Sequence, residues 1–379
     1  MQSHGGQVHR LHDHDPSADD VTDAMSPARF ARRRLLKSAL FGGAKDAGVL
    51  SPAESTNALN SEATHTVIGI VLDVSPHVLV LQTAAGEQRL TLAASTAAWR
   101  GGDVAPAALR QGDRAIAKRN YVRKAIADRI WAEIGRVTGT IVERDADTLL
   151  VDEGTEKGRK ILVIPPYATG RIQVRFPRLQ PGYLIDVIGL RRPGFVEALI
   201  PATSQPPYRA DQPPRPPMVS GHVPDSISGT ATWHEPGEEA EDLLGVAYPA
   251  LDPETGCPGH GHARPGEAVA PPDDPAHCAG DFRRAEHYAV DPHLAGPGCV
   301  RLPYLSLGSV LQIRNECVPR ARDLPVTSCG AAARLFCDRC VVCGTSPRGR
   351  VADLTMSAFV DLGGDLASGC FNATITIGG

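Results

Sequence analysis

The stretch VIGIVL at residues 67–72 decides the fold of the region around it, because its β-branched and apolar side chains are typical of a strand. A related stretch, VTGTIV, stands at residues 137–142. The same runs follow each copy in order: VLVL (78–81), RLTL (89–92) and AIA (115–117), then TLLV (148–151), ILVI (161–164) and LIDVI (184–188). A repeated unit of short strands predicts two small β modules, at residues 63–132 and 133–203.

Each module resembles the oligonucleotide/oligosaccharide-binding fold, a small β-barrel, in the order of its runs and in the glycine turn before the last one. The segment between the modules, residues 118–134, is predicted as a short helix with basic residues on its polar side. The modules contain no paired carboxylates, histidine clusters or phosphate loops, so binding or spacing is favoured over catalysis. Three aromatic side chains could stack on sugars, although single aromatics more often lie in a core: Tyr121, Trp131 and Tyr167.

Residues 204–220 carry prolines at positions 206, 207, 213, 214, 216 and 217. This composition predicts a stiff, extended spacer that cannot form a core of its own. It marks the boundary of a C-terminal domain at residues 221–379.

Residues 1–62 are expected to be disordered, because they show no apolar periodicity. Their histidines could bind a transition metal weakly or belong to a solvated tail: His4, His9, His12 and His14. The stretch RRRLLK at 32–37 resembles the twin-arginine export motif, but the apolar run behind it, residues 39–44, is short for a signal. The segment is either an export signal or a short basic helix.

Composition limits the partners. The formal net charge is -4, so no overall basic field favours nucleic acid as a partner. No apolar run is long enough to cross a bilayer, and no cofactor is expected. The oligomeric state is left open.

The C-terminal domain contains the stretches GTATWH (229–234), LGSVLQI (307–313), DRCVVC (338–343) and DLTMSAF (353–359). In this order they resemble motifs of the expansin and rare lipoprotein A families. The resemblance covers about 150 residues. It implies a six-stranded double-psi β-barrel with disulfides that acts on cell-wall polysaccharide. The predicted fold class is therefore mainly β: two small barrels, a proline-rich linker and this barrel.

The resemblance also implies a site. Asp353 matches the aspartate at the base of the sugar groove, which acts as an acid if its pKa is raised. Its alternative role is a helix N-cap. Asp338 matches a strand-end aspartate and is otherwise a turn carboxylate. Substrate contacts are assigned to Trp233, Tyr304 and Arg339.

The sequence departs from the families in ways that bear on catalysis. No histidine stands near Leu302, and Val351 and Ala352 replace the usual His-Phe pair. A hydrolase needs a second carboxylate, and the first strand offers only Glu235, which is weakly placed. A lytic transglycosylase needs a single acid/base, so whether the barrel cleaves glycan stays open.

All nine cysteines fall within the C-terminal domain: Cys257, Cys278, Cys299, Cys317, Cys329, Cys337, Cys340, Cys343 and Cys370. The resemblance implies disulfides, and a zinc site that includes His260 and His262 is the alternative. An odd number leaves at least one thiol free, metal-bound or paired between chains.

The sequence thus predicts a secreted or cell-envelope protein that binds wall polysaccharide, with peptidoglycan as the leading candidate. Whether it has lytic transglycosylase activity stays open. A non-catalytic structural or protein-interaction module, stabilised by disulfides or zinc, is the alternative.

Overall fold

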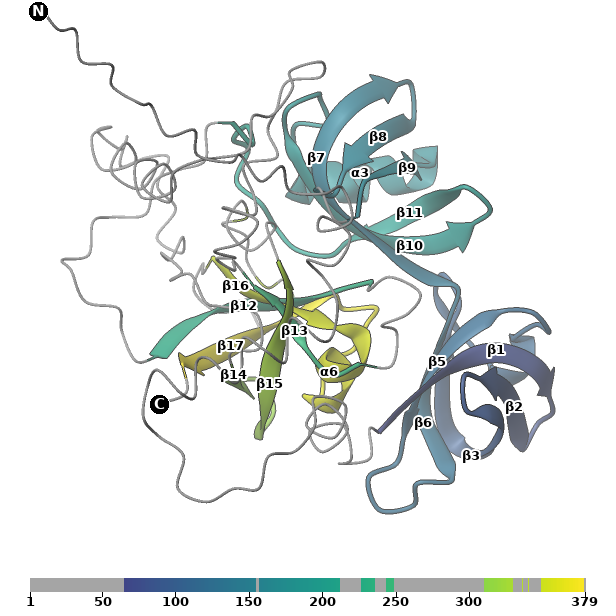
Figure 1. Cartoon of the computed structure of the whole chain (residues 1–379). Helices are drawn as coiled ribbons and strands as arrows, with labels where there is room; N and C mark the ends of the chain where they lie inside the picture. The colour runs from purple at the N-terminus through teal and green to yellow at the C-terminus, as the bar shows by residue number, and fades with distance from the viewer. Residues whose placement is uncertain are drawn as a thin grey trace, which may run out of the picture. The chain divides into compact units, whose positions relative to one another are not determined.

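The computed structural model describes residues 65–154, 157–211, 226–235, 243–248, 310–329, 336, 340 and 349–377. The chain divides into two units, Met1–Ala58 and Leu59–Gly379, and all described residues belong to the second. The fold is mainly β and contains closed barrels, as the sequence predicts (Figure 1). The expectations for residues 1–62 lie outside the described residues.

The first module is a sheet that closes on itself. It contains β1 (Thr66–Val74), β2 (Val78–Thr83), β3 (Gly86–Trp99), β4 (Asp103–Val104), the short 3-10 helix η3 (Pro106–Ala108), β5 (Arg114–Arg119) and β6 (Ile126–Ala132). The sheet order is β2-β1-β5-β6-β3-β4, and β2 also pairs with β3, which completes a ring. Within the ring only β3 and β6 run parallel.

The second module repeats this ring. It contains β7 (Ile134–Asp145), β8 (Thr148–Asp152), β9 (Arg159–Val163), α3 (Pro166–Arg175), β10 (Leu184–Arg192) and β11 (Phe195–Pro201). These strands form a closed barrel in the order β10-β11-β9-β8-β7, with β9 and β11 parallel. Strand order and directions are therefore the same in both modules (Figure 1).

Details of the backbone repeat as well. The first strand of each module has a register shift, between Val71 and Asp73 in β1 and between Ile141 and Glu143 in β7. The turn before the fourth strand of each ring has a glycine with a φ of +88°, Gly112 and Gly182. Only glycine adopts this conformation without strain. The internal repeat seen in the sequence is thus a repeat of structure.

Gly139 on β7 tests how closely the strands approach each other. A methyl group there would overlap the carbonyl oxygen of Asp152 on β8, and one at Gly69 would overlap the carbonyl oxygen of Gln82. We expect Gly139→Ala to lower the free energy of unfolding by about 1–3 kcal/mol, because the strands must separate. Denaturant unfolding measures this change. Gly102→Ala is the control, since open space surrounds Gly102, and an equal loss in both variants would contradict the expectation.

The helix predicted over residues 118–134 is wrong. Those residues form the end of β5, a turn, β6 and the start of β7. The turn depends on Asn120, whose side-chain oxygen accepts hydrogen bonds from the backbone N–H groups of Val122 and Arg123. Such a turn reverses the chain, and the pairing of β6 with both β5 and β3 then outweighs any helical preference.

The predicted spacer is wrong over its first part. Residues 204–211 pack on the second barrel: Tyr208 and Ala210 are buried in a cluster with Leu184 and Phe336. The N–H of Ala210 also donates to the carbonyl of Gly182. Tyr208 supplies the apolar anchor that a purely proline-rich segment lacks. Residues 212–220 lie outside the described part of the chain.

The C-terminal domain is a third closed barrel. Its strands are β12 (Ser226–His234), β13 (Val246–Tyr248), β14 (Val310–Asn315), β15 (Arg320–Cys329), β16 (Arg350–Thr355) and β17 (Cys370–Ile377), with α6 (Met356–Asp361) after β16. The ring order is β12-β16-β13-β15-β14-β17 (Figure 1). Two of its pairs are parallel, β12 with β16 and β13 with β15.

Thr355, and not Asp353, caps α6. The Thr355 side chain accepts a hydrogen bond from the N–H of Ala358, while Asp353 lies inside β16. The alternative role of Asp353 as a helix cap is therefore wrong.

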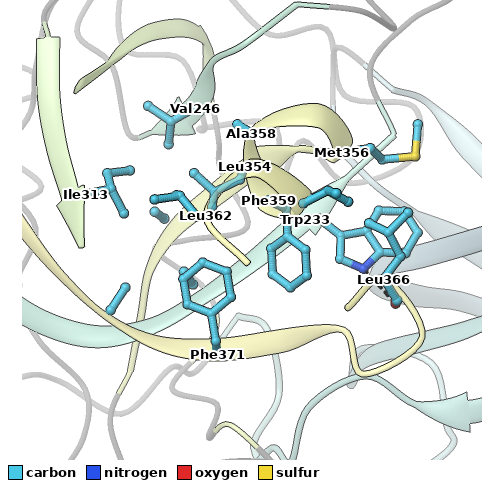
Figure 2. Packing of buried hydrophobic residues seen from close by; sticks show 14 of the residues in the cluster. Trp233, Val246, Ile313, Leu354, Met356, Ala358, Phe359, Leu362, Leu366 and Phe371 are labelled. Atoms are coloured by element: carbon cyan, nitrogen blue, oxygen red, sulfur yellow. Dashed lines mark hydrogen bonds between the residues drawn. The ribbon is translucent and has the colours of Figure 1, made fainter. Parts of the chain in front are cut away.

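The apolar core of the third barrel is continuous with apolar residues of the other two. Figure 2 shows its centre, where Phe359 lies near Phe371 and Trp233 lies beside Leu366. The Phe359 and Phe371 ring centroids are 4.8 Å apart. The same buried cluster includes Trp131 of β6 and Ile188 of β10, so packing links the three barrels. No helix among the described residues is long and apolar enough to cross a membrane.

Candidate functional site

Asp353 lies in β16 beside the end of β12. The parallel pairing of these strands sets Thr232 opposite Asp353 and His234 opposite Thr355. The Thr232 hydroxyl donates to Asp353 Oδ1 at 2.8 Å. His234 Nδ1 is 3.1 Å from the Asp353 backbone oxygen and 3.9 Å from Oδ2. All three side chains are buried, so two of the four motifs meet in one polar cluster inside the barrel.

The histidine of this cluster is neutral near pH 7. Burial, reinforced by the charge of Lys157, lowers the pKa of His234 to about 3, against the opposing influence of Asp353. A neutral ring must donate from Nδ1 here, because its neighbour is a carbonyl oxygen, which can only accept.

Asp353 is ionised in the same range. Burial alone would raise its pKa, but His234, which becomes charged only below about pH 3, and the charges of Lys157, Arg350 and Arg136 outweigh burial and lower the pKa to about 2. A general acid at neutral pH needs a raised pKa so that it carries a proton. The geometry therefore favours a carboxylate that organises its surroundings over one that donates a proton.

The His234 environment predicts a pH dependence of stability. Between about pH 6.5 and pH 3 the unfolded state takes up a proton at His234 and the folded state does not, so stability falls as the pH falls. One such proton contributes a slope of at most about 1.4 kcal/mol per pH unit. Stability from Asp353, whose pKa is depressed, is lost only as the pH drops from 3.8 toward 2.

We expect His234→Gln to reduce this slope in denaturant unfolding measured from pH 7 to pH 4. The control is His77→Gln, at an exposed position on the turn before β2, which should leave the slope as it is. An unchanged slope in His234→Gln would show that the folded protein protonates this ring.

A second buried network lies next to the first and joins two barrels. Asp186 of β10 is fully buried, and its carboxylate accepts from Arg136 of β7 at 2.8 and 2.6 Å and from Arg350 of β16. The hydroxyls of Thr138 and Thr203 donate to the same carboxylate. Burial alone would raise the pKa of Asp186, but the two arginines together with these hydrogen bonds lower it.

No motif in the sequence marks this network, and sequence reasoning missed it. Its signal is a charge inside an apolar run: Asp186 interrupts LIDVI, and Arg136 precedes VTGTIV. The strand pairings show which residues of the first barrel match these two. Thr66 stands where the second barrel has Arg136, and Ile116 stands where it has Asp186, so neither matching residue is charged. The charges are thus specific to the barrel that meets Arg350.

Of the residues assigned to catalysis or sugar binding besides Asp353, the structure describes only Trp233. Trp233 is fully buried beside Leu366 (Figure 2), and its indole N–H donates to the carbonyl of Leu366 at 3.0 Å. The Arg136 guanidinium lies 5.4 Å from the Trp233 ring. This is the environment of a core residue. Asp338, Arg339 and Tyr304 lie outside the described residues.

The other candidate aromatic side chains also have structural partners. Trp131 is buried and donates to Asp365 at 2.9 Å. Tyr167 is 70% exposed on α3 and donates to Glu197 at 2.8 Å. Of these, only Tyr167 presents a largely open ring.

Glu235, the weakly placed second carboxylate, is held by the second barrel. It accepts from Arg191 at 2.8 Å, from Lys160 at 3.4 Å and from the backbone N–H of Arg136 at 3.1 Å. These donors leave it poorly suited to act as a base on a sugar.

The structure describes the side chains of Cys317, Cys340 and Cys370, and the backbone of Cys329 at the end of β15. Cys317, in the turn after β14, is disulfide-bonded. The sulfur atoms of Cys340 and Cys370 lie 3.2 Å apart, which is longer than a disulfide bond. Five cysteines lie outside the described residues: Cys257, Cys278, Cys299, Cys337 and Cys343. The two histidines of the zinc alternative, His260 and His262, lie outside them as well. Among the residues that are described, no group of three or more potential ligands could hold a metal ion.

Comparison with known proteins adds no family: no family model matches the chain, and no curated protein matches it.

Proposed function

We propose that this chain is a secreted or cell-envelope protein whose C-terminal barrel has the double-psi form and binds cell-wall polysaccharide. Peptidoglycan is the leading candidate for this ligand. The observation that carries the proposal is the pairing of β12 with β16, which brings the GTATWH motif alongside the motif that begins at Asp353. The six-stranded ring with its two parallel pairs supports the same barrel type. Export through residues 32–37 and disulfides in the oxidised compartment belong to this proposal.

The first two barrels support a role in binding. Each is a five-stranded ring with one parallel pair, as in the oligonucleotide/oligosaccharide-binding fold.

Binding without cleavage is the form of the activity that we favour. Asp353 is buried and ionised, and Glu235 already has three donors. Neither carboxyl group is set up to protonate a glycosidic oxygen.

Incubation of the purified chain with insoluble peptidoglycan tests both the proposed binding and the proposed absence of cleavage. We expect the protein to sediment with the wall and to release no anhydro-muropeptides, because neither Asp353 nor Glu235, the two candidate carboxyls that the structure describes, is placed to protonate a glycosidic oxygen. We expect Asp353→Asn to sediment equally well while it remains folded. Release of anhydro-muropeptides that disappears in Asp353→Asn would establish lytic transglycosylase activity instead, and a protein that stays in solution would end the binding proposal.

The second candidate is a non-catalytic scaffold. The shared apolar cluster and the buried Arg136–Asp186–Arg350 network favour it, because they join barrels in a way that a simple glycan-binding module does not need. Absence of affinity for every insoluble glycan, together with indifference of all assays to Asp353→Asn, would support this alternative.

A further inference from the structure

Cations from two barrels gather around one aromatic ring, that of Tyr121 in the turn between β5 and β6. The Arg320 guanidinium of β15 lies 3.6 Å from the ring centroid, and the Lys118 ammonium of β5 lies 5.7 Å from it. The ring of His65, just before β1, lies 4.0 Å away. We call these four residues the Tyr121 cluster.

The end of α6 holds the cluster in place. The Tyr121 hydroxyl and Arg320 both donate to the carbonyl oxygen of Asp361, each at 3.3 Å. The carboxylate of Asp361 is already occupied, since it accepts from Arg322 at 2.9 Å and from the backbone N–H of His65 at 3.0 Å. The arrangement is therefore fixed by several hydrogen bonds from a neighbouring element.

Several cations lie close together here, and the carboxylates that act on Lys118 already bond to other groups: Asp361 to Arg322, Asp365 to Trp131 and Arg129, and Asp128 to Asn120. Within the described part of the chain, neither Lys118 nor Arg320 forms an ion pair with a carboxylate. Lys124, exposed in the same turn, is close enough to oppose protonation of His65. Burial, and then the charge of Arg320, lowers the pKa of Lys118 against the opposing charges of Asp128, Asp365 and Asp361. Like charges held together cost free energy unless an anion neutralises them.

A second observation also indicates a ligand. His65 Nδ1 is buried and has no hydrogen-bond partner among the described residues. A buried polar atom without a partner is unusual in a folded protein. An acidic group bound beside the Tyr121 ring would supply both an acceptor and a further negative charge.

We propose that the Tyr121 cluster, with Lys124 at its rim, binds the acidic groups of a wall polysaccharide, either carboxylate or phosphate. The choice of a polysaccharide rests on the function proposed above, whereas the affinity for anions does not. A small basic patch on a chain of net charge -4 is better suited to single acidic groups than to the continuous backbone of a nucleic acid.

The test is titration calorimetry of the full chain with four probes: oligogalacturonate, inorganic phosphate, a neutral chitin oligomer and a single-stranded DNA oligonucleotide. We expect oligogalacturonate or phosphate to bind, with an affinity that falls as salt rises. The difference between these two probes identifies which acidic group is preferred.

Two variants localise the binding. Lys118→Gln combined with Lys124→Gln should lower the affinity for the anion by about tenfold, since two of the nearest charges are lost. Lys124→Gln alone should lower this affinity by about threefold. Lys124 is exposed, so its replacement should hardly affect folding. The matched control is Arg171→Gln with Arg178→Gln, which removes two exposed charges from the second barrel and should change nothing.

The outcomes separate the two proposals. Binding of the neutral oligomer with no binding of either anion would overturn the anion site and leave the proposed function standing. Anion binding that is equal in all variants would place it elsewhere and also overturn the inference. Tighter binding of DNA than of oligogalacturonate would assign the cluster to nucleic acid, against our proposal.

Discussion

Replacement of Asp186 by asparagine is expected to destabilise the protein by about 3–5 kcal/mol, one of the two largest effects that the structure predicts. The Asp186 carboxylate lies fully buried between the guanidinium groups of Arg136 and Arg350. Asparagine keeps the shape of the side chain and removes its charge. The two guanidinium groups would then lose the carboxylate that they share in a buried site.

The expected loss is large because water cannot replace the carboxylate. Arg136 is 2% exposed and Arg350 is 1% exposed, so neither guanidinium can be hydrated without opening the contact between the barrels. Arg136 also donates to the carbonyl of Gly369 in the third barrel at 2.8 Å. Loss of the carboxylate should therefore loosen the second barrel from the third as well as lower overall stability.

Denaturant unfolding followed by tryptophan fluorescence measures the change. Asp211→Asn is the control, because Asp211 pairs with Arg209 at the surface, where such a pair contributes less than about 1 kcal/mol. The triple replacement Arg136→Met, Asp186→Leu and Arg350→Met should recover part of the stability, since it removes all three buried charges of this network. A loss below about 1 kcal/mol in Asp186→Asn would show that the network is hydrated or open.

The strand architecture could be predicted from the sequence because it depends on local signals. Apolar runs separated by turn residues mark β1 to β3 and their copies β7 to β9. The glycines at positions 112 and 182 mark the same turn in both modules. Both signals act over a few residues, so the order of residues along the chain is enough to reveal the repeat.

Errors arose where distant contacts override local composition. The charged residues between positions 118 and 134 suggest the polar face of a helix, yet β6 pairs with two strands of its own barrel. The prolines after position 204 suggest a free spacer, yet Tyr208 anchors this segment to the second barrel. In each case tertiary packing decides the outcome.

The site was predictable only in part for the same reason. Asp353 was found through its motif, but its neighbour His234 lies more than a hundred residues earlier and meets it only through parallel pairing. Arg136 and Asp186 belong to no motif, and only the fold brings Arg350 to them. A charge inside an apolar run was the one local sign of a buried network.

The second large effect is expected for Trp233→Ala, which should destabilise the third barrel by about 3–5 kcal/mol through the cavity that it leaves. Trp233 is fully buried beside Leu366 and within the same core as Phe359 (Figure 2). Its indole N–H also satisfies the Leu366 carbonyl, so Trp233→Phe should cost a smaller amount, about 1–3 kcal/mol. The Arg136 guanidinium near the ring adds a cation–π contact that alanine removes and phenylalanine keeps in part.

These variants also decide whether Trp233 contacts sugar. A core residue should lose stability in both variants, while the fraction of protein that stays folded sediments with peptidoglycan as the wild type does. Tyr167→Ala is the control for the loss of an aromatic ring, because Tyr167 is 70% exposed and its removal should hardly change stability. If Trp233→Ala instead unfolds at the wild-type denaturant concentration and fails to sediment, the ring faces the glycan, and the arrangement of β12 in the barrel must change when sugar binds.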